Sequence, residues 1–379
     1  MKRLFFYTTL FVSLYSCDNK TSSDSSISSS NTLENFSFSV DTLVVDVGEE
    51  IFMPGAYSIF ALSDDADRVF TFYEPETEVH EIDLKNLKLL QRHRFEKDGP
   101  NMIPQFTSYM QQVNDDELFL ANFYKSGIFK TSGEKTQTIP LQSEKYTGFD
   151  PDYSFTMGNS IRISADKKAV LFFPNAGIGA PDGLAVLNTE KMSGKLLPLP
   201  ALEMSNKYRV SLKDGSVSLG QLQQTSWVNG QFLIYSGATS DIYVYEHLSD
   251  SLRLVTFPHE IVPKAKTGEF PTEFDSYEKM REVSNEINKQ ITFSEFLWDE
   301  SRQMYFRMAQ QNWQLNEVAM AYTADTYLFA YDQEFNLIGE TEMDGLDFMF
   351  SGGFMREGKL YMRWVVGENP AFFVYTFDF

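Results

Sequence analysis

The chain has 379 residues, with 53 acidic and 32 basic side chains and a formal net charge of −21. This charge argues against nucleic acid or an anionic lipid surface as the main partner, and the single cysteine cannot form a disulfide within the chain. Aromatic residues are 15% of the chain, with 34 Phe and 19 Tyr, which favours β-strands over helices.

Residues 1–16 have the pattern of a signal peptide. A basic start, MKR, is followed by an apolar run at 4–14 that is too short to span a bilayer. The segment LYSC at 14–17 resembles the lipobox of bacterial lipoproteins. That resemblance implies cleavage before Cys17 and lipidation, palmitate included, of its thiol and new amino end. An ordinary secretory signal with a chance cysteine is the alternative.

Residues 17–35 are expected to be the lipidated Cys17 and a Ser-rich disordered linker. Seven of the 15 residues at 18–32 are Ser, and such a segment buries too little apolar surface to order itself. As a random coil it would span roughly 20 Å. We therefore expect a lipid-anchored protein of the cell envelope, at the outer membrane, which faces either the periplasm or the cell surface.

Residues 36–379 repeat one pattern six times: a strand, a polar turn, and then three further strands separated by a loop and a tight turn. The second strands read RVFTFYE (68–74), ELFLANF (117–123), AVLFFPN (169–175), QFLIYSG (231–237), QMYFRMA (303–309) and KLYMRWV (359–365). The third strands read EVHEIDL (78–84), SGIFKTS (126–132), GLAVLNT (183–189), DIYVYEH (241–247), TYLFAYD (326–332) and AFFVYTF (372–378). Six four-stranded units are typical of a β-propeller.

The sixth unit ends after its third strand, and one strand-like segment elsewhere belongs to no unit. This segment is FSFSVDTLVVDV at 36–47. We expect it to pair with the last strand and to close the ring, which removes two open sheet edges. The predicted fold is thus all-β: a six-bladed β-propeller of four-stranded antiparallel blades, closed by an N-terminal strand, with one helical insertion.

Three short segments carry a resemblance to known propellers. The turn SADKK at 164–168 resembles the S-P-D-G-K turn of TolB-like six-bladed propellers. EKDGPNMI at 96–103 and WDESRQMYFR at 298–307 resemble an uncharacterised family of propeller lipoproteins of Gram-negative bacteria, known only as a domain of unknown function. The resemblance covers nearly all of the chain after the signal peptide, and it implies no catalytic residues.

Most of the connecting length is expected on one face of the disc, which we call the loop face. Connections after the second and fourth strands of the units share this face because strands alternate in direction. They lie at 96–106, 142–159, 174–182, 200–222, 258–290 and 310–325. Long connections carry function more often than short ones. One of them predicts a helix from Glu273 to Lys289 with Thr272 as its N-cap, which either packs on the disc or forms a mobile lid.

Two arginines stand out in the second strands. Alignment of the six copies places Arg307 and Arg363 in one otherwise apolar column, two residues after Tyr305 and Tyr361. The two arginines either line a shared pocket for a planar anion between blades five and six, together with these tyrosines, or tie blades together as structural ion pairs. The structural interpretation is the one that we favour.

Two further aromatic residues are candidates for ligand contact. Trp313 and Tyr322 fall in the predicted loop at 310–325, where they either stack on a sugar or peptide or simply pack.

The four histidines, at 80, 93, 247 and 259, lack metal-ligand spacing. The acidic turns lack the spacing of a calcium loop, so no metal and no cofactor are expected. No sequence motif of nucleophilic catalysis is present either. We expect a monomeric, non-enzymatic binding or scaffolding module that presents its loop face to a protein, peptide or glycan and meets the membrane only through its lipid. The alternatives are a propeller-type glycan hydrolase or lyase with unidentified carboxylates, and an accessory subunit of an envelope complex.

Overall fold

The structure is a computed structural model that describes residues 31–49, 59–155, 158–175, 181–220, 222–316, 321–346 and 352–379. The predictions for the signal peptide, for Cys17 and for the linker up to residue 30 lie outside these ranges. Within them, no helix is both long and apolar enough to cross a bilayer.

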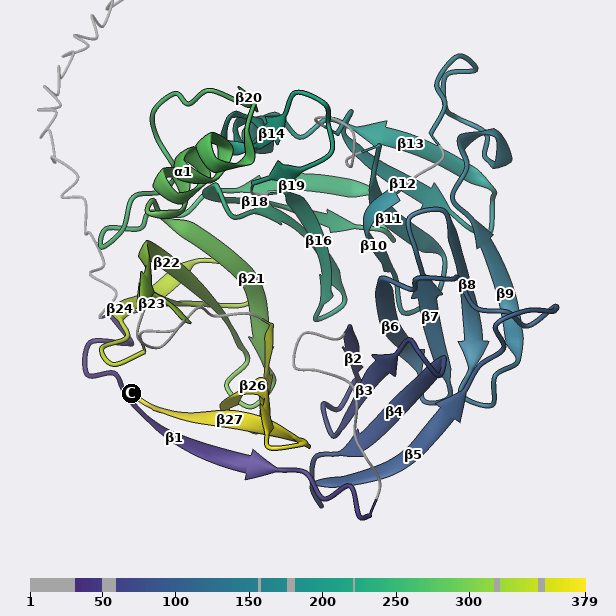
Figure 1. Ribbon diagram of the computed structural model, residues 1–379, viewed down its shortest axis with the longest axis horizontal. Helices are drawn as coiled ribbons and strands as arrows, with labels where there is room; N and C mark the ends of the chain where they lie inside the picture. Colours follow the sequence, from purple (N-terminus) through teal and green to yellow (C-terminus); the bar gives the residue numbers. More distant parts are fainter. Residues whose placement is uncertain are drawn as a thin grey trace, which may run out of the picture.

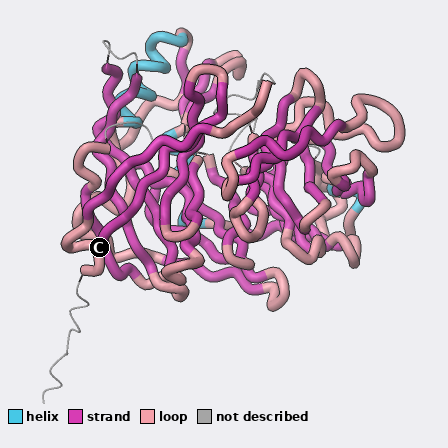
Figure 2. Tube along the Cα trace, turned by 90° about the horizontal axis from the view of Figure 1, so that it is seen from below, coloured by secondary structure: helices cyan, strands magenta, loops and turns pink. Residues whose placement is uncertain are grey.

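The described residues form six antiparallel sheets of four strands each and a seventh sheet of three strands. Figure 1 shows the four-stranded sheets, here numbered sheet 1 to sheet 6 in chain order, arranged around a common centre. The first strand of each sheet contacts the first strand of the next, from β2 to β25. In the edge-on view of Figure 2 the molecule is a thick disc, with its longest helical segment at the upper left.

Sheets 1 to 3 contain β2 (Phe60–Leu62), β3 (Arg68–Tyr73), β4 (Glu78–Asp83) and β5 (Lys88–Arg94); β6 (Tyr109–Asn114), β7 (Glu117–Ala121), β8 (Lys125–Lys130) and β9 (Lys135–Pro140); and β10 (Gly158–Ile163), β11 (Ala169–Pro174), β12 (Leu184–Asn188) and β13 (Ser193–Leu197). Sheets 4 to 6 contain β16 (Gln223–Val228), β17 (Gln231–Ser236), β18 (Thr239–Glu246) and β19 (Ser251–Val255); β21 (Thr292–Asp299), β22 (Met304–Asn316), β23 (Ala321–Tyr331) and β24 (Leu337–Glu342); and β25 (Gly353–Arg356), β26 (Lys359–Val366), β27 (Asn369–Asp378) and β1 (Ser37–Val44). All predicted second and third strands overlap observed ones.

The N-terminal strand β1 pairs antiparallel with β27, from Ser37 opposite Asp378 to Val44 opposite Ala371. The predicted pairing of the first strand with the last is confirmed. β27 therefore has a neighbour on both sides, so its backbone groups are not left open at a sheet edge. In Figure 1 the purple strand β1 lies along the outside of the yellow strand β27.

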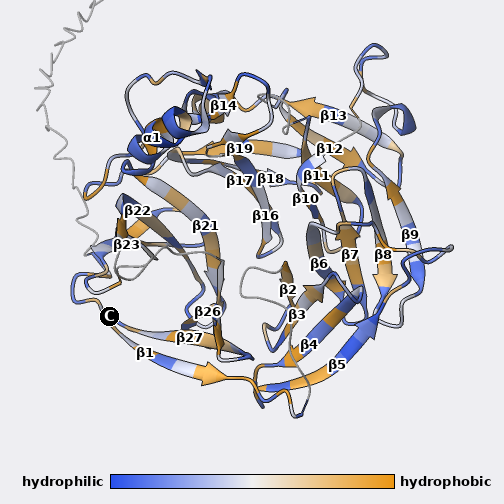
Figure 3. Cartoon of the chain, in the orientation of Figure 1, coloured by the Kyte–Doolittle hydropathy of each residue, from blue (hydrophilic) through white to orange (hydrophobic). Residues whose placement is uncertain are grey.

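The core lies between the sheets. Six hydrophobic clusters of the described residues each join two neighbouring sheets: 1 and 2, 2 and 3, 3 and 4, 4 and 5, 5 and 6, and 6 and 1. Along β3, Val69 belongs to the cluster with sheet 6, and Phe70 belongs to the cluster with sheet 2. Since both faces of a second strand are buried in this way, these strands read as continuous apolar runs. The outer strands β5 and β9 are largely hydrophilic (Figure 3).

Residues 31–35, which the sequence assigned to the linker, make contacts with the folded domain. Leu33 is fully buried in the cluster between sheets 5 and 6. The Thr32 N–H donates to Ile338 O at 2.9 Å, and the Asn31 side chain donates to Glu340 O at 2.9 Å and accepts from Glu340 N–H at 3.0 Å. The burial of Leu33 and these hydrogen bonds hold the segment in place. The Ser-rich composition from which the linker was predicted gives no sign of such contacts.

The predicted helix is present, but its predicted start and N-cap are wrong. The α-helix α1 spans Tyr277–Asn288, and the hydroxyl of its N-cap Ser276 accepts from Lys279 N–H at 3.5 Å. The segment Glu273–Phe274 is instead the short strand β20, which pairs parallel with β14 (Val210–Leu212). Hydrogen bonds to a distant segment thus keep the chain extended past Thr272, whose backbone carbonyl accepts from Ser211 N–H at 2.8 Å.

The three-stranded sheet and the helix pack together into one unit, here called the insertion, which two loop-face connections form: 200–222 and 258–290. β14 pairs with β20 and with β15 (Ser218–Leu219), next to the 3-10 helix η2 (Pro200–Tyr208). Met280 and Ile287 of α1 pack with Val210 and Ala238 in a separate hydrophobic cluster. α1 therefore packs on this insertion by its apolar face, and its remaining surface is hydrophilic, drawn blue in Figure 3. The other 3-10 helix of the described residues, η1 (Ser143–Lys145), belongs to a different connection.

Candidate functional site

A groove of about 1290 Å³ lies between α1 and the far end of the β22–β23 hairpin, both of which belong to long connections of the loop face. Its walls combine amide, aromatic and charged side chains. They are Phe270, Arg281, Glu282, Val283, Asn285, Glu286, Asn288, Lys289, Asn312, Trp313, Gln314, Leu315, Tyr322 and Asp325.

One wall of the groove is a hairpin where the sequence predicted a loop at 310–325. β22 and β23 continue as paired strands to Asn316 and from Ala321. The pairing contains one extra residue on β22 between Gln311 and Gln314, which is a β-bulge. A bulge changes the direction of the following side chains, and Trp313 and Gln314 both line the groove.

Asn312 fixes this bulge in place. Its backbone has a φ of 58°, a left-handed conformation that asparagine tolerates better than most residues. Its N–H donates to Lys289 O at 2.8 Å, and its side chain donates to Asp325 Oδ2 at 2.6 Å. The hairpin is thus joined to the C-terminal end of α1, and the two walls of the groove form one unit.

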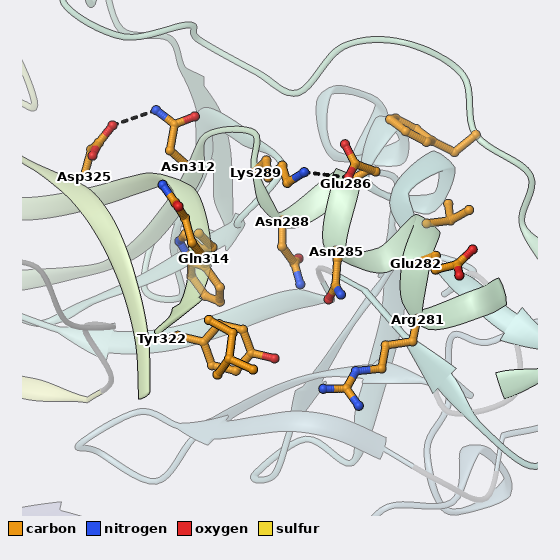
Figure 4. Close-up of a pocket in the computed structure, with 14 residues that line it drawn as sticks. Arg281, Glu282, Asn285, Glu286, Asn288, Lys289, Asn312, Gln314, Tyr322 and Asp325 are labelled. Atoms are coloured by element: carbon orange, nitrogen blue, oxygen red, sulfur yellow. Dashed lines mark hydrogen bonds and ion pairs between the residues drawn. The ribbon is translucent and has the colours of Figure 1, made fainter. Parts of the chain in front are cut away.

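The other wall is the polar face of α1. Arg281, Asn285 and Asn288 follow the spacing of one helical face, away from the buried Met280 and Ile287. Figure 4 shows these three side chains on the side of the helix that faces Tyr322. The Tyr322 hydroxyl raises the pKa of the Arg281 guanidinium above its usual range. Both residues line the groove, so this pairing brings a cation and a phenol together inside it.

Lys266 holds the end of α1 from behind. It is only 2% exposed, and its ammonium donates to Ile287 O at 3.0 Å, to Gln290 O at 3.2 Å and to Thr292 Oγ1 at 2.9 Å. It joins the last carbonyls of the helix to the start of β21 and thereby positions the α1 wall. Burial lowers the pKa of Lys266 to about 7.

This buried ammonium predicts a specific pH dependence of stability. Between pH 7 and the normal pKa of lysine, the unfolded chain holds a proton that the folded protein has lost, so folding becomes more favourable as the pH rises. We expect the free energy of unfolding of the wild type to rise over this range, relative to Lys266→Met, by up to about 1.4 kcal/mol per pH unit. Urea titrations at several pH values measure it. Lys264→Met changes an exposed lysine and should keep the wild-type slope of unfolding free energy against pH. If the wild type and Lys266→Met have the same slope, the lowered pKa of Lys266 is contradicted.

The carboxylates of the groove are exposed and partly engaged. Asp325 accepts from Asn312, Glu286 accepts from Lys289 Nζ at 2.6 Å, and Glu282 is the third. The groove therefore offers hydrogen-bond acceptors beside its amide and aromatic side chains.

The structure places Arg307 and Arg363 in two separate environments. Arg307 is fully buried between sheets 4 and 5, where Nε donates to Ser294 O at 2.8 Å and Nη1 donates to Ser240 O at 2.5 Å. Its guanidinium carbon lies 4.8 Å from the ring centre of Phe296. Arg363 lies between sheets 6 and 1, with its guanidinium carbon 4.0 Å above the ring of Phe60. The predicted pocket shared by both arginines is therefore wrong.

A one-residue offset in the fifth copy explains the error. The residues aligned with Tyr305 in copies one to four all face the next sheet, and they are Phe70, Phe119, Leu171 and Leu233. Tyr361 also faces the next sheet, sheet 1, but Tyr305 faces the previous one, sheet 4. Because side chains alternate along a strand, a shift of one residue moves Arg307 to the opposite side of its sheet.

Tyr305 and Tyr361 are core residues. Tyr305 is fully buried, stacks on Phe335 at 4.6 Å and accepts from Asn229 Nδ2 at 3.2 Å. Tyr361 is 4% exposed and stacks on Phe354 at 5.3 Å. Of the predicted ligand-contact residues, the structure brings only Trp313 and Tyr322 together at the groove.

Two of the buried histidines, His80 and His93, lie beside carboxylates of sheet 1. His80 Nε2 lies 3.2 Å from Glu78, and His93 Nε2 lies 2.7 Å from Glu81 in sheet 1. In the described part of the chain, no three His, Cys, Asp or Glu side chains are grouped so as to hold a metal ion.

The model of a protein family described as a domain of unknown function, DUF4221, matches residues 33–342. The chain belongs to the DUF4221 family. The sequence resemblance to a family known only as a domain of unknown function is thereby confirmed. The DUF4221 match includes α1 and the whole β22–β23 hairpin, so the groove lies within the part of the chain that defines the family.

A solved DUF4221 structure shares the fold. The crystal structure of a family member from Bacteroides vulgatus matches with a TM-score of 0.60 at 13% identity, over 90% of this chain and 98% of that chain. A putative exported protein from Bacteroides fragilis matches with a TM-score of 0.47 at 8% identity, over 90% and 95% of the two chains. No curated protein matches the chain.

Twelve of the fourteen groove residues were missed by the sequence analysis, among them Arg281, Asn285, Asn288, Asn312 and Gln314. The polar residues at 281, 285 and 288 do carry a signal, because they recur at helical spacing opposite the apolar stripe of α1. The hairpin wall carries no such signal, since the bulge that orients it depends on contact with α1.

Proposed function

We propose that this DUF4221 protein is a non-enzymatic glycan-binding lipoprotein, built as a closed six-bladed propeller with its binding site in the groove. The blade count is supported by six four-stranded sheets joined by six clusters, among them the one between sheets 6 and 1. The pairing of β1 with β27 supports closure of the ring. The groove is where two long connections of the loop face, at 258–290 and 310–325, provide side chains to one cavity.

The observation that carries the proposal is the mixture of amide and aromatic side chains in the groove. Asn285, Asn288 and Gln314 each offer both a donor and an acceptor, which match the hydroxyl groups of a sugar. Trp313 and Tyr322 add apolar ring surface with polar edges, which suits the C–H face of a sugar ring. Fixed walls reduce the entropy lost on binding, and the contacts of Asn312 with Lys289 and Asp325 provide them.

Removal of groove aromatics tests this function. We expect Trp313→Ala and Tyr322→Ala each to weaken binding of a soluble oligosaccharide by about tenfold or more, since a lost stacking contact of about 1.4 kcal/mol has that effect. A glycan array identifies the oligosaccharide, and titration calorimetry measures the affinities. Tyr277→Ala is the matched control, because Tyr277 is an exposed aromatic residue of α1 that does not line the groove.

Two results would overturn the proposal. Equal affinity in Trp313→Ala, Tyr322→Ala and wild type would place binding elsewhere. Chromatographic detection of cleaved oligosaccharide that depends on Glu282 or Asp325 would favour the alternative, a hydrolase or lyase that uses groove carboxylates.

The envelope location rests on LYSC at 14–17. A lipid on Cys17 would attach the propeller to the outer membrane through residues 18–30. We expect Cys17→Ser to move the protein from the membrane fraction to the soluble fraction and to abolish incorporation of labelled palmitate. Ser23→Ala, within the same linker, should leave both unchanged. Membrane association that survives Cys17→Ser would refute the lipid anchor.

A further inference from the structure

One cationic side chain of the groove has no acidic partner. Arg281 lines the groove and is exposed to solvent. In the described part of the chain, no Asp or Glu side chain lies within ion-pair distance of its guanidinium, and its contact is with the hydroxyl of Tyr322. Because a guanidinium carries five N–H donors, this contact leaves further donors available to a ligand.

The other charged side chains of the groove lie away from Arg281. Glu282 and Glu286 share one flank of α1 with Lys289, about 100° further around the helix. There Lys289 Nζ already contacts Glu286 at 2.6 Å, and in Figure 4 this pair lies apart from Arg281. Asp325 is on the hairpin wall, where it accepts from the side chain of Asn312. The guanidinium of Arg281 is therefore not neutralised by the acids that line the same groove.

The neighbours of Arg281 suit a sugar ring. In Figure 4 its guanidinium points toward Tyr322, on the same side of α1 as Asn285 and Asn288. The Tyr322 ring offers apolar surface for the C–H face of a sugar, and the two amides offer donors and acceptors for its hydroxyl groups. A carboxylate on that sugar would accept charge-assisted hydrogen bonds from the guanidinium, which are about twice as strong as neutral ones.

We propose, on the basis of the glycan-binding function proposed above, that the groove selects sugars that carry a carboxylate, such as a uronic or a sialic acid. Arg281 is the residue that recognises this carboxylate. The net charge of −21 opposes the preference only weakly, since charges further away than about 8 Å are largely screened at physiological ionic strength, whereas the guanidinium contacts the carboxylate directly.

The acids of the groove narrow the class of ligand further. Glu282, Glu286 and Asp325 line it together with Arg281. A glycan with a charge on every sugar would bring several carboxylates close to these three, and like charges at short distance repel. The groove therefore suits a glycan in which one acidic sugar lies among neutral ones.

A glycan array on which each acidic sugar is spotted beside its carboxyl-reduced form tests the selection. We expect the wild type to bind acidic members at least about tenfold more tightly than their reduced forms, because reduction removes a hydrogen bond between charged groups. Arg281→Gln should remove this difference and bind the reduced forms as the wild type does. Titration calorimetry with sialyllactose and its carboxyl-reduced form measures the affinities.

Lys279→Gln is the matched control. It removes the same charge from an exposed position on α1 that does not line the groove, so the preference for acidic sugars should remain. Loss of the preference in Lys279→Gln as well would assign it to net charge and would contradict the role of Arg281.

Failure of this inference is distinguishable from failure of glycan binding. Equal binding of acidic and reduced forms by the wild type, or a preference that survives Arg281→Gln, would overturn the inference and leave glycan binding in the groove intact. Absence of binding to every glycan on the array would overturn the function on which the inference rests. Thermal melting of Arg281→Gln should match the wild type, because Arg281 is exposed, and shows that the variant is folded.

Discussion

A chain that begins at Val45 is expected to aggregate, or to melt at least about 10 °C below a chain that begins at Asn31. The shorter chain lacks β1, so the backbone groups of β27 that pair with Ser37–Val44 are left open. It also lacks Leu33, which is fully buried, and burial of a leucine of this kind is worth about 2–5 kcal/mol. Both losses fall on sheet 6 and on its contact with sheet 5.

The control for this experiment is the chain that begins at Asn31 itself. It keeps every described contact of the N-terminal segment, including those of Asn31 with Glu340. Thermal melting and light scattering of the two truncated chains and of the full chain give the comparison. If the chain that begins at Val45 melts like the other two and stays monomeric, β1 is dispensable for stability.

Substitution of Arg307 by Met is expected to lower the free energy of unfolding by about 2–4 kcal/mol. Two buried carbonyls, Ser294 O and Ser240 O, lose charged donors, and the stacking on Phe296 is lost. Relief of a buried charge offsets part of this cost, since burial already lowers the pKa of Arg307 to about 10. Met keeps the length of the stem, so the remaining packing changes little.

Arg363→Met is the matched control for Arg307→Met. Burial lowers the pKa of Arg363 to about 10 as well, but its interaction in the described structure is the stacking on Phe60. We expect it to cost about 1 kcal/mol or less. The two effects should add within about 0.5 kcal/mol in the double variant, since the arginines lie at different sheet interfaces. Urea denaturation measures all three variants, and a clear departure from additivity would contradict the separate placement.

The strand pattern of this protein is predictable from sequence because it is local. Val69 and Phe70 are both buried, so their strand is visible as an apolar run, and the turns between strands are marked by polar residues. The pairing of β1 is predictable for a different reason: the sixth unit lacks a strand, and an unassigned strand is available. These inferences need only the pattern of apolar and polar residues along the chain and a count of the strands in each unit.

The features that the sequence did not predict depend on contacts between distant segments of the chain. Thr272 is a plausible N-cap, but its carbonyl pairs with Ser211 and the helix begins at Tyr277. Arg307 is on the side opposite to the predicted one because of a one-residue offset that composition does not reveal. Of the candidate site, Trp313 and Tyr322 were identified as exposed aromatics, yet their common cavity exists only because Asn312 bonds to the end of α1.

The position of β1 also sets the order in which the protein can fold. Asn31 leaves the ribosome early, but its partner Glu340 lies 309 residues later in the chain, and β27 follows later still. Contacts of such long sequence separation form slowly, since a large loop must close before they contribute. Sheets 1 to 5 can assemble as the chain emerges, while β1 stays unpaired until Phe379 has been made. A nascent chain arrested anywhere before β27 therefore exposes an unpaired strand at each end, and this is the stage at which it most needs a chaperone.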